Sequence, residues 1–412
     1  MSPSLTCQLA HDCSTVQTGA VENESNDQRP LDGIRVIELA QWVAGPSAAG
    51  LLADWGADVI KVEAPTGDPQ RSFLQALGVD KVMPNPSFAQ DNRGKRSMVL
   101  DLATDEARDT LHQLLETADV FITNMRPNAL DRLGLNPGAL RERHPTLVIA
   151  AQTGYGSVGP EKDTPGYDIG AFIARTGMAR TNRPESDDPV NLKGGIGDHM
   201  TGVTTCMAVL AALMGRERTG EGQLVETSLF QTGLYAVSMD LSTQLTLGRL
   251  ARMRPRTELA TPLVNCYKSR DGKWFYLIGV EAARHMAGIG AAIGWPDITS
   301  DKRFASAPKI MENRVELIAV LDEAFAAEDL AHWTDRFTEH DVWWAPCQTM
   351  AEVAVDPQAL ALDSFIETTH GDEKLTTVAS PVRYNGHVLK PRRPVPTLGQ
   401  HTDEVLAELA DS

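Results

Sequence analysis

IRVIELAQWVAGPSAAGLLADWGADVIKVE (34–63) decides the fold, because it carries the signals of a strand, a helix and a second strand in that order. IRVIEL (34–39) is a β-branched run between an Asp-Gly pair and a Gly-Pro turn, a pattern typical of a buried strand. In the segment that follows, Pro46 stands near a first helical position and Gly56 just past the last one. ADVIKVE (57–63) then repeats the strand pattern. The stretch therefore predicts a β-loop-α-β unit.

The same alternation continues along the chain. SMVLDL (97–102), DVFITN (119–124) and TLVIAAQ (146–152) predict further strands, and DEARDTLHQLLETA (105–118) predicts a helix. Strands that alternate with helices are typical of an α/β protein whose parallel sheet is covered on both faces. Such a sheet binds its ligands beyond the carboxyl ends of its strands.

Changes in texture divide the chain into four parts. Residues near 245–262 are basic and irregular, which marks a linker, and a hairpin is expected to turn at RDG (270–272) beyond it. We expect a disordered tail over 1–29, the first part of a large domain over 30–244, a smaller α+β domain over 245–335 and a return to the large domain over 336–412.

Composition excludes several classes of protein. The chain has 412 residues, and its 38 basic and 55 acidic residues give a formal charge of −17, which argues against nucleic acid as a partner. Its five cysteines are scattered without a metal-ligand spacing, which argues for a reducing compartment and against a bound metal. Neither a basic and apolar leader nor an uninterrupted apolar run of about 18 residues is present. The sequence thus predicts a cytoplasmic protein with no membrane partner.

One nucleotide-binding motif is misleading. GYGSVG (154–159) fits G-x-G-x-x-G and follows a predicted strand, but PEKDTPGYD (160–168) comes next and has two prolines and no helical period. Since the dinucleotide fingerprint needs a helix that starts on its glycines, we expect no nicotinamide or flavin site here.

GGIGDHMTG (194–202) is the segment most typical of a reaction site. It places one carboxylate, Asp198, among four glycines, where a bulky group can approach the backbone. A plain Gly-Asp turn would give the same letters. HMTGVTTCMAVLAALM (199–214), which overlaps it, is apolar nearly all round and predicts a buried helix.

Six ordered blocks carry a resemblance that covers the chain from about residue 31 to its end. They are VIELAQWVAGPSAAGLLADWGADVIKVEAPTGD (36–68), NRGKRSMVLDL (92–102), NMRPNALDRLGL (124–135), PGYD (165–168), GDHMTG (197–202) and PTLGQHTDEVL (396–406). Together the blocks resemble the family III CoA-transferases, which include formyl-CoA and carnitine CoA-transferases and the α-methylacyl-CoA racemases. The resemblance implies a Rossmann-like large domain that binds coenzyme A, a smaller α+β domain and a homodimer of interlocked chains.

The resemblance also implies roles for two acids. Asp198 falls on the nucleophilic aspartate of the transferases, which attacks an acyl-CoA thioester to give an aspartyl anhydride and then an aspartyl-CoA thioester. The glycines beside it would free backbone N–H groups for the developing oxyanion. Asp168 would orient the substrate or polarise the intermediate, although a helix N-cap before IGAFIA (169–174) fits it equally well.

The same resemblance implies a binding site for CoA, which acts as a substrate and needs no prosthetic group or metal beside it. Asn124 and Arg132 would contact the nucleotide, and Arg71, Lys95 and Arg96 could meet the phosphates, although surface charges are usually only solvated. The remaining expected contacts are Gln41, Trp42, Val43 and Ala44 at the thioester end, with Tyr167 and Gly197 in the substrate pocket.

Three departures bear on the reaction and the substrate. Tyr167 stands where the racemases carry a basic histidine, and a phenol is a poor base at neutral pH, so CoA transfer to a carboxylic acid is favoured over racemisation. A CoA-binding protein without catalysis is a third alternative. Val43 replaces a glutamine of formyl-CoA transferase, and ELATPLVN (258–265) lacks the glycine-rich loop of that enzyme. Both changes argue against oxalate and favour a larger or more apolar acyl group.

Overall fold

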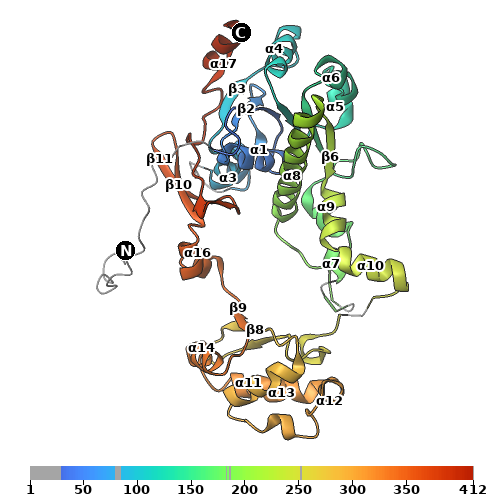
Figure 1. The fold of residues 1–412 in the computed structure, drawn as a ribbon, viewed down its shortest axis with the longest axis vertical. Helices are drawn as coiled ribbons and strands as arrows, with labels where there is room; N and C mark the ends of the chain where they lie inside the picture. The colour runs from blue at the N-terminus through green and yellow to red at the C-terminus, as the bar shows by residue number, and fades with distance from the viewer. Residues whose placement is uncertain (1–28, 79–84, 182, 185–186, 251–252, 412) are drawn as a thin grey trace.

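The fold of the chain is seen in a computed structural model that describes all residues except 1–28, 79–84, 182, 185–186, 251–252 and 412. The expected disordered tail, apart from Arg29, lies outside the described residues. A large body holds a parallel sheet, and a smaller body hangs below it in Figure 1, joined by the segments that follow α10 (Ser238–Leu247) and β9 (Trp344–Pro346).

The central sheet has six parallel strands in the order β3-β2-β1-β4-β5-β6. The strands are β1 (Arg35–Leu39), β2 (Asp58–Glu63), β3 (Arg96–Val99), β4 (Val120–Thr123), β5 (Val148–Thr153) and β6 (Leu224–Ser228). Ile37 of β1 lies opposite Ile60 of β2 and Phe121 of β4, so β1 is central in the sheet. The strands expected from the sequence are all present, and the order of strands reverses between β1 and β4. That reversal opens a crevice at the carboxyl ends of these strands.

The two faces of the sheet are covered by different helices because adjacent side chains of a strand point in opposite directions. Val36 and Val120 pack with α1 (Ala44–Asp54) and α8 (Ile196–Thr219). Ile37 and Phe121 pack with four helices on the other face. These are α4 (Asp105–Glu116), α5 (Pro127–Arg132), α6 (Pro137–Arg143) and α17 (Thr402–Ala410).

Helices α1 and α8 pack with their backbones close together. A Cβ atom added to Gly202 would overlap Ser47 Oγ and would lie 3.1 Å from Ala44 O, so only glycine fits. This contact fixes the beginning of α8 beside the beginning of α1, next to the crevice.

The expectation that α8 is buried all round is wrong. One side packs on the core through residues such as Cys206 and Val209, whereas Met200, Met207 and Met214 are exposed. Length and apolar composition alone would allow α8 to cross a bilayer, a criterion that core helices of globular proteins also meet. Its other side is an apolar face that the described residues leave exposed.

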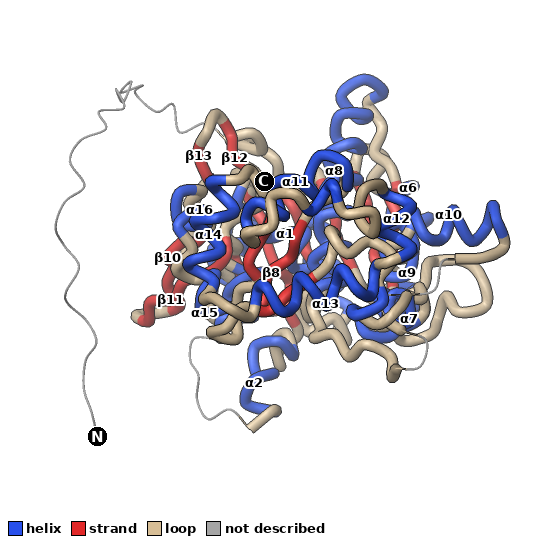
Figure 2. The backbone as a smooth tube through the Cα atoms, turned by 90° about the horizontal axis from the view of Figure 1, so that it is seen from below, coloured by secondary structure: helices blue, strands red, loops and turns tan. Residues whose placement is uncertain are grey.

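The smaller body has its own core. β7 (Cys266–Lys268) and β8 (Trp274–Leu277) form the expected hairpin, and β9 adds a third antiparallel strand beyond the expected boundary at 335. The aromatic side chains of Tyr267 and Phe275 are buried in this core. Its helices are α11 (Ala282–Ala292), α12 (Ala307–Glu312), α13 (Arg314–Phe325) and α14 (Leu330–Glu339). They are spread across the molecule in the view from below in Figure 2.

The chain then runs back to the large body. Short helices α15 (Met350–Val353) and α16 (Pro357–Ala361) precede the antiparallel pair β10 (Phe365–His370) and β11 (Glu373–Val378). A two-residue ladder, β12 (Arg383–Tyr384) with β13 (His387–Val388), follows. Finally the Ser97 N–H donates to Nδ1 of His401, which places α17 beside β3 at the edge of the sheet.

Candidate active site

The first turn of α8 carries Asp198 to the crevice. Gly195 precedes the helix with φ at +101°, a left-handed conformation that favours glycine, and the chain turns sharply there into the helix. Asp198 then lies in the first helical turn, partly exposed. Gly197 serves packing, because a Cβ atom at this position would lie 2.5 Å from the ring of Phe172.

Asp168 is held against the same turn. Its Oδ2 accepts hydrogen bonds from the backbone N–H of Gly195, at 2.6 Å, and of Gly197, at 3.3 Å. Asp168 precedes a short π-helix (Ile169–Ala174) but makes no capping bond to it. It thus caps α8 and not its own helix, and the N–H groups of Gly195 and Gly197 that the sequence assigned to an oxyanion are already engaged.

The two acids affect each other electrostatically. Burial, and after it the negative charges of Asp168 and Asp91, raise the pKa of Asp198 to about 7, against the lowering effect of His199. A carboxyl group with a pKa near neutrality is desolvated, and a desolvated carboxylate is a stronger nucleophile than one in water.

Sequence reasoning missed a neighbouring ion pair. His199 Nε2 lies 3.0 Å from Oδ1 of Asp91, which is buried in α3 (Pro86–Asn92). The hydrogen bond to the carboxylate of Asp91 raises the pKa of His199. The position of His199, next to Asp198 in GDHMTG, was the available signal, but nothing in the sequence pointed to Asp91.

The loop after β1 is fixed by Asn124. The N–H of Gln41 donates to Asn124 Oδ1 at 3.0 Å, and Nδ2 of Asn124 donates to the Gln41 carbonyl at 2.7 Å. Val43 and Ala44 begin α1, and Ala44 is buried. Asn124 therefore shapes the loop at the thioester end of the predicted site, and its contact with the nucleotide stays a prediction.

Trp42 links this loop to the region of Asp168. Its φ of +66° is unusual for a bulky residue, and its N–H donates to Oδ1 of the buried Asp68 at 3.1 Å. Its ring meets Phe73 and Tyr167 edge to face, with centroids 5.8 and 6.0 Å apart. Since Tyr167 precedes Asp168, this aromatic cluster of Trp42, Phe73 and Tyr167 lies next to Asp168.

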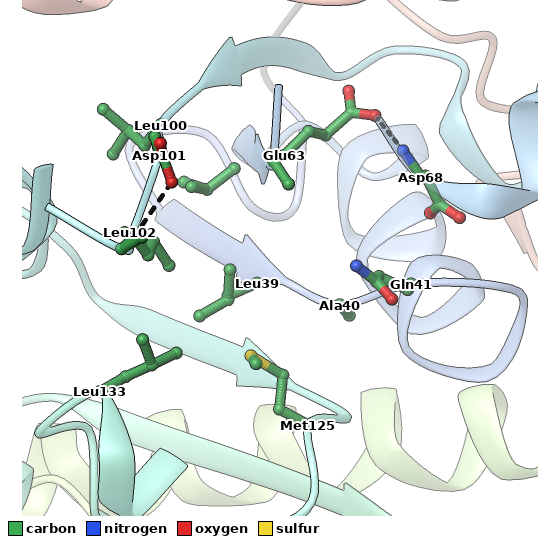
Figure 3. Close-up of a pocket in the computed structure, with 13 residues that line it drawn as sticks. Leu39, Ala40, Gln41, Glu63, Asp68, Leu100, Asp101, Leu102, Met125 and Leu133 are labelled. Carbon is green, nitrogen blue, oxygen red and sulfur yellow. Dashed lines mark hydrogen bonds between the residues drawn. The ribbon is translucent and has the colours of Figure 1, made fainter. Parts of the chain in front are cut away.

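A pocket of about 310 Å³ opens at the carboxyl ends of the strands, where the fold predicts a ligand site. Figure 3 shows Leu39, Ala40 and Gln41 at the end of β1, with Met125 and Leu133 below them. The full lining is Leu39, Ala40, Gln41, Val62, Glu63, Ala64, Asp68, Leu100, Asp101, Leu102, Ala103, Met125 and Leu133. Gln41 belongs to both this pocket and the loop that carries Trp42, so the pocket borders that loop.

The four basic residues expected in the CoA site, Arg132 at the nucleotide and the other three at the phosphates, are not equivalent. Lys95 is fully buried, with Nζ 2.6 Å from Oε2 of Glu38, and Arg96 is buried among Asp58, Glu404 and Glu408. Neither side chain is available to a phosphate. Arg71 is paired with Glu63, whereas Arg132 is exposed beside Leu133 of the pocket.

A buried ionic network that no local sequence pattern predicts lies beneath the loop. Lys61 Nζ lies 2.8 Å from Oε1 of Glu38 and 2.9 Å from Oδ2 of Asp68, all fully buried or nearly so. Asp68 in turn accepts the N–H of Trp42 and donates its own N–H to Glu63, a contact drawn in Figure 3. The network thus fixes the unusual backbone of Trp42.

Comparison with known proteins places this geometry in a family. The chain is 31% identical to (R)-2-hydroxy-4-methylpentanoate CoA-transferase of Clostridioides difficile over 92% of this chain and 95% of that one. It is also 31% identical to cinnamoyl-CoA:phenyllactate CoA-transferase of Clostridium sporogenes, over 93% and 94%. Among solved structures, a CAIB/BAIF family protein from Brucella suis superimposes with a TM-score of 0.81 at 29% identity, covering 93% of this chain and all of that one. Residues 31–402 match the model of CoA-transferase family III, and the chain therefore belongs to that family.

Proposed function

We propose that the protein transfers CoA from an acyl-CoA donor to a carboxylic acid, with Asp198 as the nucleophile. Membership of the family and relatives named as CoA-transferases support CoA transfer in general. One observation carries the assignment of the nucleophile: Asp198 is a partly exposed carboxylate at the start of α8, in a turn whose backbone Asp168 holds in place.

The proposed reaction begins with attack by an oxygen of Asp198 on the thioester carbonyl. The C–S bond breaks, CoA leaves as a thiolate, and an acyl-aspartyl anhydride forms. The thiolate then attacks the aspartyl carbonyl of the anhydride, which releases the donor acid and leaves an aspartyl-CoA thioester. The acceptor carboxylate then attacks the aspartyl-CoA thioester, which releases the thiolate and forms a second anhydride between Asp198 and the acceptor. Attack of the thiolate on the acceptor's carbonyl gives the new acyl-CoA and restores Asp198.

The pocket at the carboxyl ends of the strands suits the nucleotide end of CoA. Its apolar wall, formed by residues such as Leu100, Leu102 and Met125, can hold an adenine ring, and Arg132 lies next to Leu133 at its edge. The pantetheine arm would then run past Gln41 toward Asp198. This path uses Arg132 for phosphate binding and leaves Lys95 and Arg96 to the interior.

The acyl group is proposed to be apolar. Trp42, Phe73 and Tyr167 present aromatic surface next to Asp168, and Val43 adds an aliphatic side chain. A branched or aryl-substituted acid would bury apolar area against these rings, whereas a small dicarboxylate would gain none. Values of kcat/KM should therefore be higher for phenyl-substituted or branched acyl-CoA than for oxalyl-CoA or succinyl-CoA.

The working form is proposed to be a homodimer. Met200, Met207 and Met214 are exposed on α8, and Met239, Leu245 and Leu247 are exposed on α10, where no side chain is buried. Large exposed apolar surface often marks an interface. The interlocked homodimer that the resemblance implies would cover it, and light scattering of Leu245→Glu beside the wild type tests the assignment.

Trapping with hydroxylamine tests the proposed nucleophile. Incubation with an acyl-CoA and hydroxylamine should convert Asp198 to a hydroxamate that peptide mass spectrometry locates. The adduct should be lost in Asp198→Ala and retained in Asp168→Asn. Labelling of Asp168 would reverse the two roles, and α-proton exchange in deuterated water without any adduct or acceptor would indicate a racemase.

A further inference from the structure

We propose that His199, fixed by Asp91, is a positioning residue that supplies the positive charge keeping Asp198 ionised at the start of α8. This inference rests on the proposed nucleophilic role of Asp198. It assigns a function to a pair of residues that the reaction steps above do not use.

The position of Asp91 is fixed by burial and by close backbone packing. This residue is 3% exposed in α3, and its backbone lies against α1, since a Cβ atom at Gly50 would approach Asp91 O to 2.7 Å. The carboxylate reaches across to the first turn of α8 and meets His199 Nε2 at 3.0 Å. The imidazole is therefore held in one orientation next to Asp198, although about half of its side-chain surface is exposed.

The charges that face Asp198 come from three elements. Asp168 precedes the π-helix, Asp91 belongs to α3, and His199 follows Asp198 in α8 itself. Both acids disfavour a carboxylate at Asp198, and the protonated imidazole alone favours it. Without the imidazolium of His199, the negative charges of Asp168 and Asp91 would oppose the ionisation of the desolvated Asp198.

The titration of the two groups agrees with this arrangement. Burial and the neighbouring acids raise the pKa of Asp198 to about 7, so ionisation of the nucleophile limits activity on the acidic side. The hydrogen bond to Asp91 raises the pKa of His199, so the imidazole is charged in the same acidic range. The imidazole is therefore charged in the acidic pH range, where Asp198 is hardest to ionise.

Two substitutions separate charge from structure. His199→Gln can still donate a hydrogen bond to Asp91 but carries no charge, whereas His199→Lys keeps a cation at every pH of interest. His387→Gln, on the exposed strand β13, is the matched control. The measurement is the pH dependence of kcat/KM for an acyl-CoA.

The acidic limb of His199→Gln should move to higher pH by about one unit, which lowers kcat/KM about tenfold well below the midpoint. The limb of His199→Lys should stay at the wild-type pH or move below it, and that of His387→Gln should not move. An unmoved limb in His199→Gln, or an equal upward shift in both His199 variants, would overturn the inference.

The hydroxylamine adduct separates this inference from the function on which it rests. If the wild-type protein forms the Asp198 adduct and the limb of His199→Gln stays unmoved, only the role of His199 fails. If the wild-type protein forms no adduct with phenyl-substituted or branched acyl-CoA, oxalyl-CoA or succinyl-CoA, the proposed function itself fails.

Discussion

Asp168 accepts the backbone N–H of Gly195 at 2.6 Å, so an acid in one segment fixes the start of the helix that carries Asp198. Negative charge near a helix N-terminus is favourable, and the same charge opposes ionisation of Asp198. Asp168 therefore orders the turn and at the same time raises the pKa of the proposed nucleophile.

Replacing Asp168 should affect these two roles differently. Asp168→Asn retains an acceptor for Gly195 and removes the charge, so the acidic limb of kcat/KM should move to lower pH by about one unit. Asp168→Ala should also lose about 1–2 kcal/mol of stability with the capping bonds. Asp335→Asn, on the exposed side of α14, controls for loss of one surface acid. A limb that moves to higher pH in Asp168→Asn would contradict this electrostatic role.

Asp198 should cost the folded state free energy at neutral and alkaline pH. The pKa of Asp198 is raised in the folded chain, so Asp198 adds no cost to folding below its unfolded pKa, where the carboxyl is protonated in both states. The free energy of unfolding then falls as pH rises, and the loss is complete above about pH 7. Asp198→Asn should therefore stabilise the protein by roughly 2–4 kcal/mol at pH 8, and the gain should shrink toward zero near about pH 4. Denaturant unfolding over this pH range measures it, and a gain that grows toward low pH would refute the raised pKa.

The contact between α1 and α8 should not tolerate a methyl group. Gly202→Ala must displace Ser47 and press on the backbone at Ala44, so we expect a loss of about 1–3 kcal/mol in the free energy of unfolding. Gly170→Ala is a matched control, because its Cβ would meet only Tyr155 Oη, at an ordinary 3.5 Å. Equal stability of the two variants would show that the helices separate easily.

Removing Asn124 should loosen the loop at Gln41. Asn124→Ala loses both side-chain bonds to that loop, which should cost about 1–3 kcal/mol of stability and raise KM for acyl-CoA several-fold more than it lowers kcat. Asn124→Asp keeps only the acceptor and should be intermediate. Asn136→Ala, which removes a cap of α6, should lower stability without changing KM. A variant of Asn124 that loses kcat at unchanged KM would place this residue in the chemistry itself.

The sheet could be predicted from the sequence because local signals decide it. Val36 and Ile37 alternate between the two faces of β1, Gly56 ends α1, and the strands that follow repeat the pattern. The polarity of α8 could not be predicted in the same way. Its composition is apolar all round, and which side meets the core depends on the close contact of Gly202 with Ser47.

Only part of the candidate site could be predicted from the sequence, for a similar reason. The family blocks indicated Asp198, Asp168 and the loop at Trp42, but the partners of these residues come from distant segments. Lys95 and Arg96 look like surface cations in NRGKRS, yet Glu38, Asp58 and Glu408 bury them through contacts that no local pattern encodes. Ion pairs of this kind join segments that only the folded chain brings together, so they cannot be predicted from local sequence.

Transfer of oxygen tests the central claim most directly. In the proposed reaction the acceptor's carboxylate oxygen becomes the bridge of the second anhydride and stays on Asp198 when the thiolate attacks the acceptor's carbonyl. A single turnover with an acceptor acid labelled with oxygen-18 should leave one labelled oxygen in the peptide that contains Asp198. Complete CoA transfer to the labelled acid without label in that peptide would contradict the account.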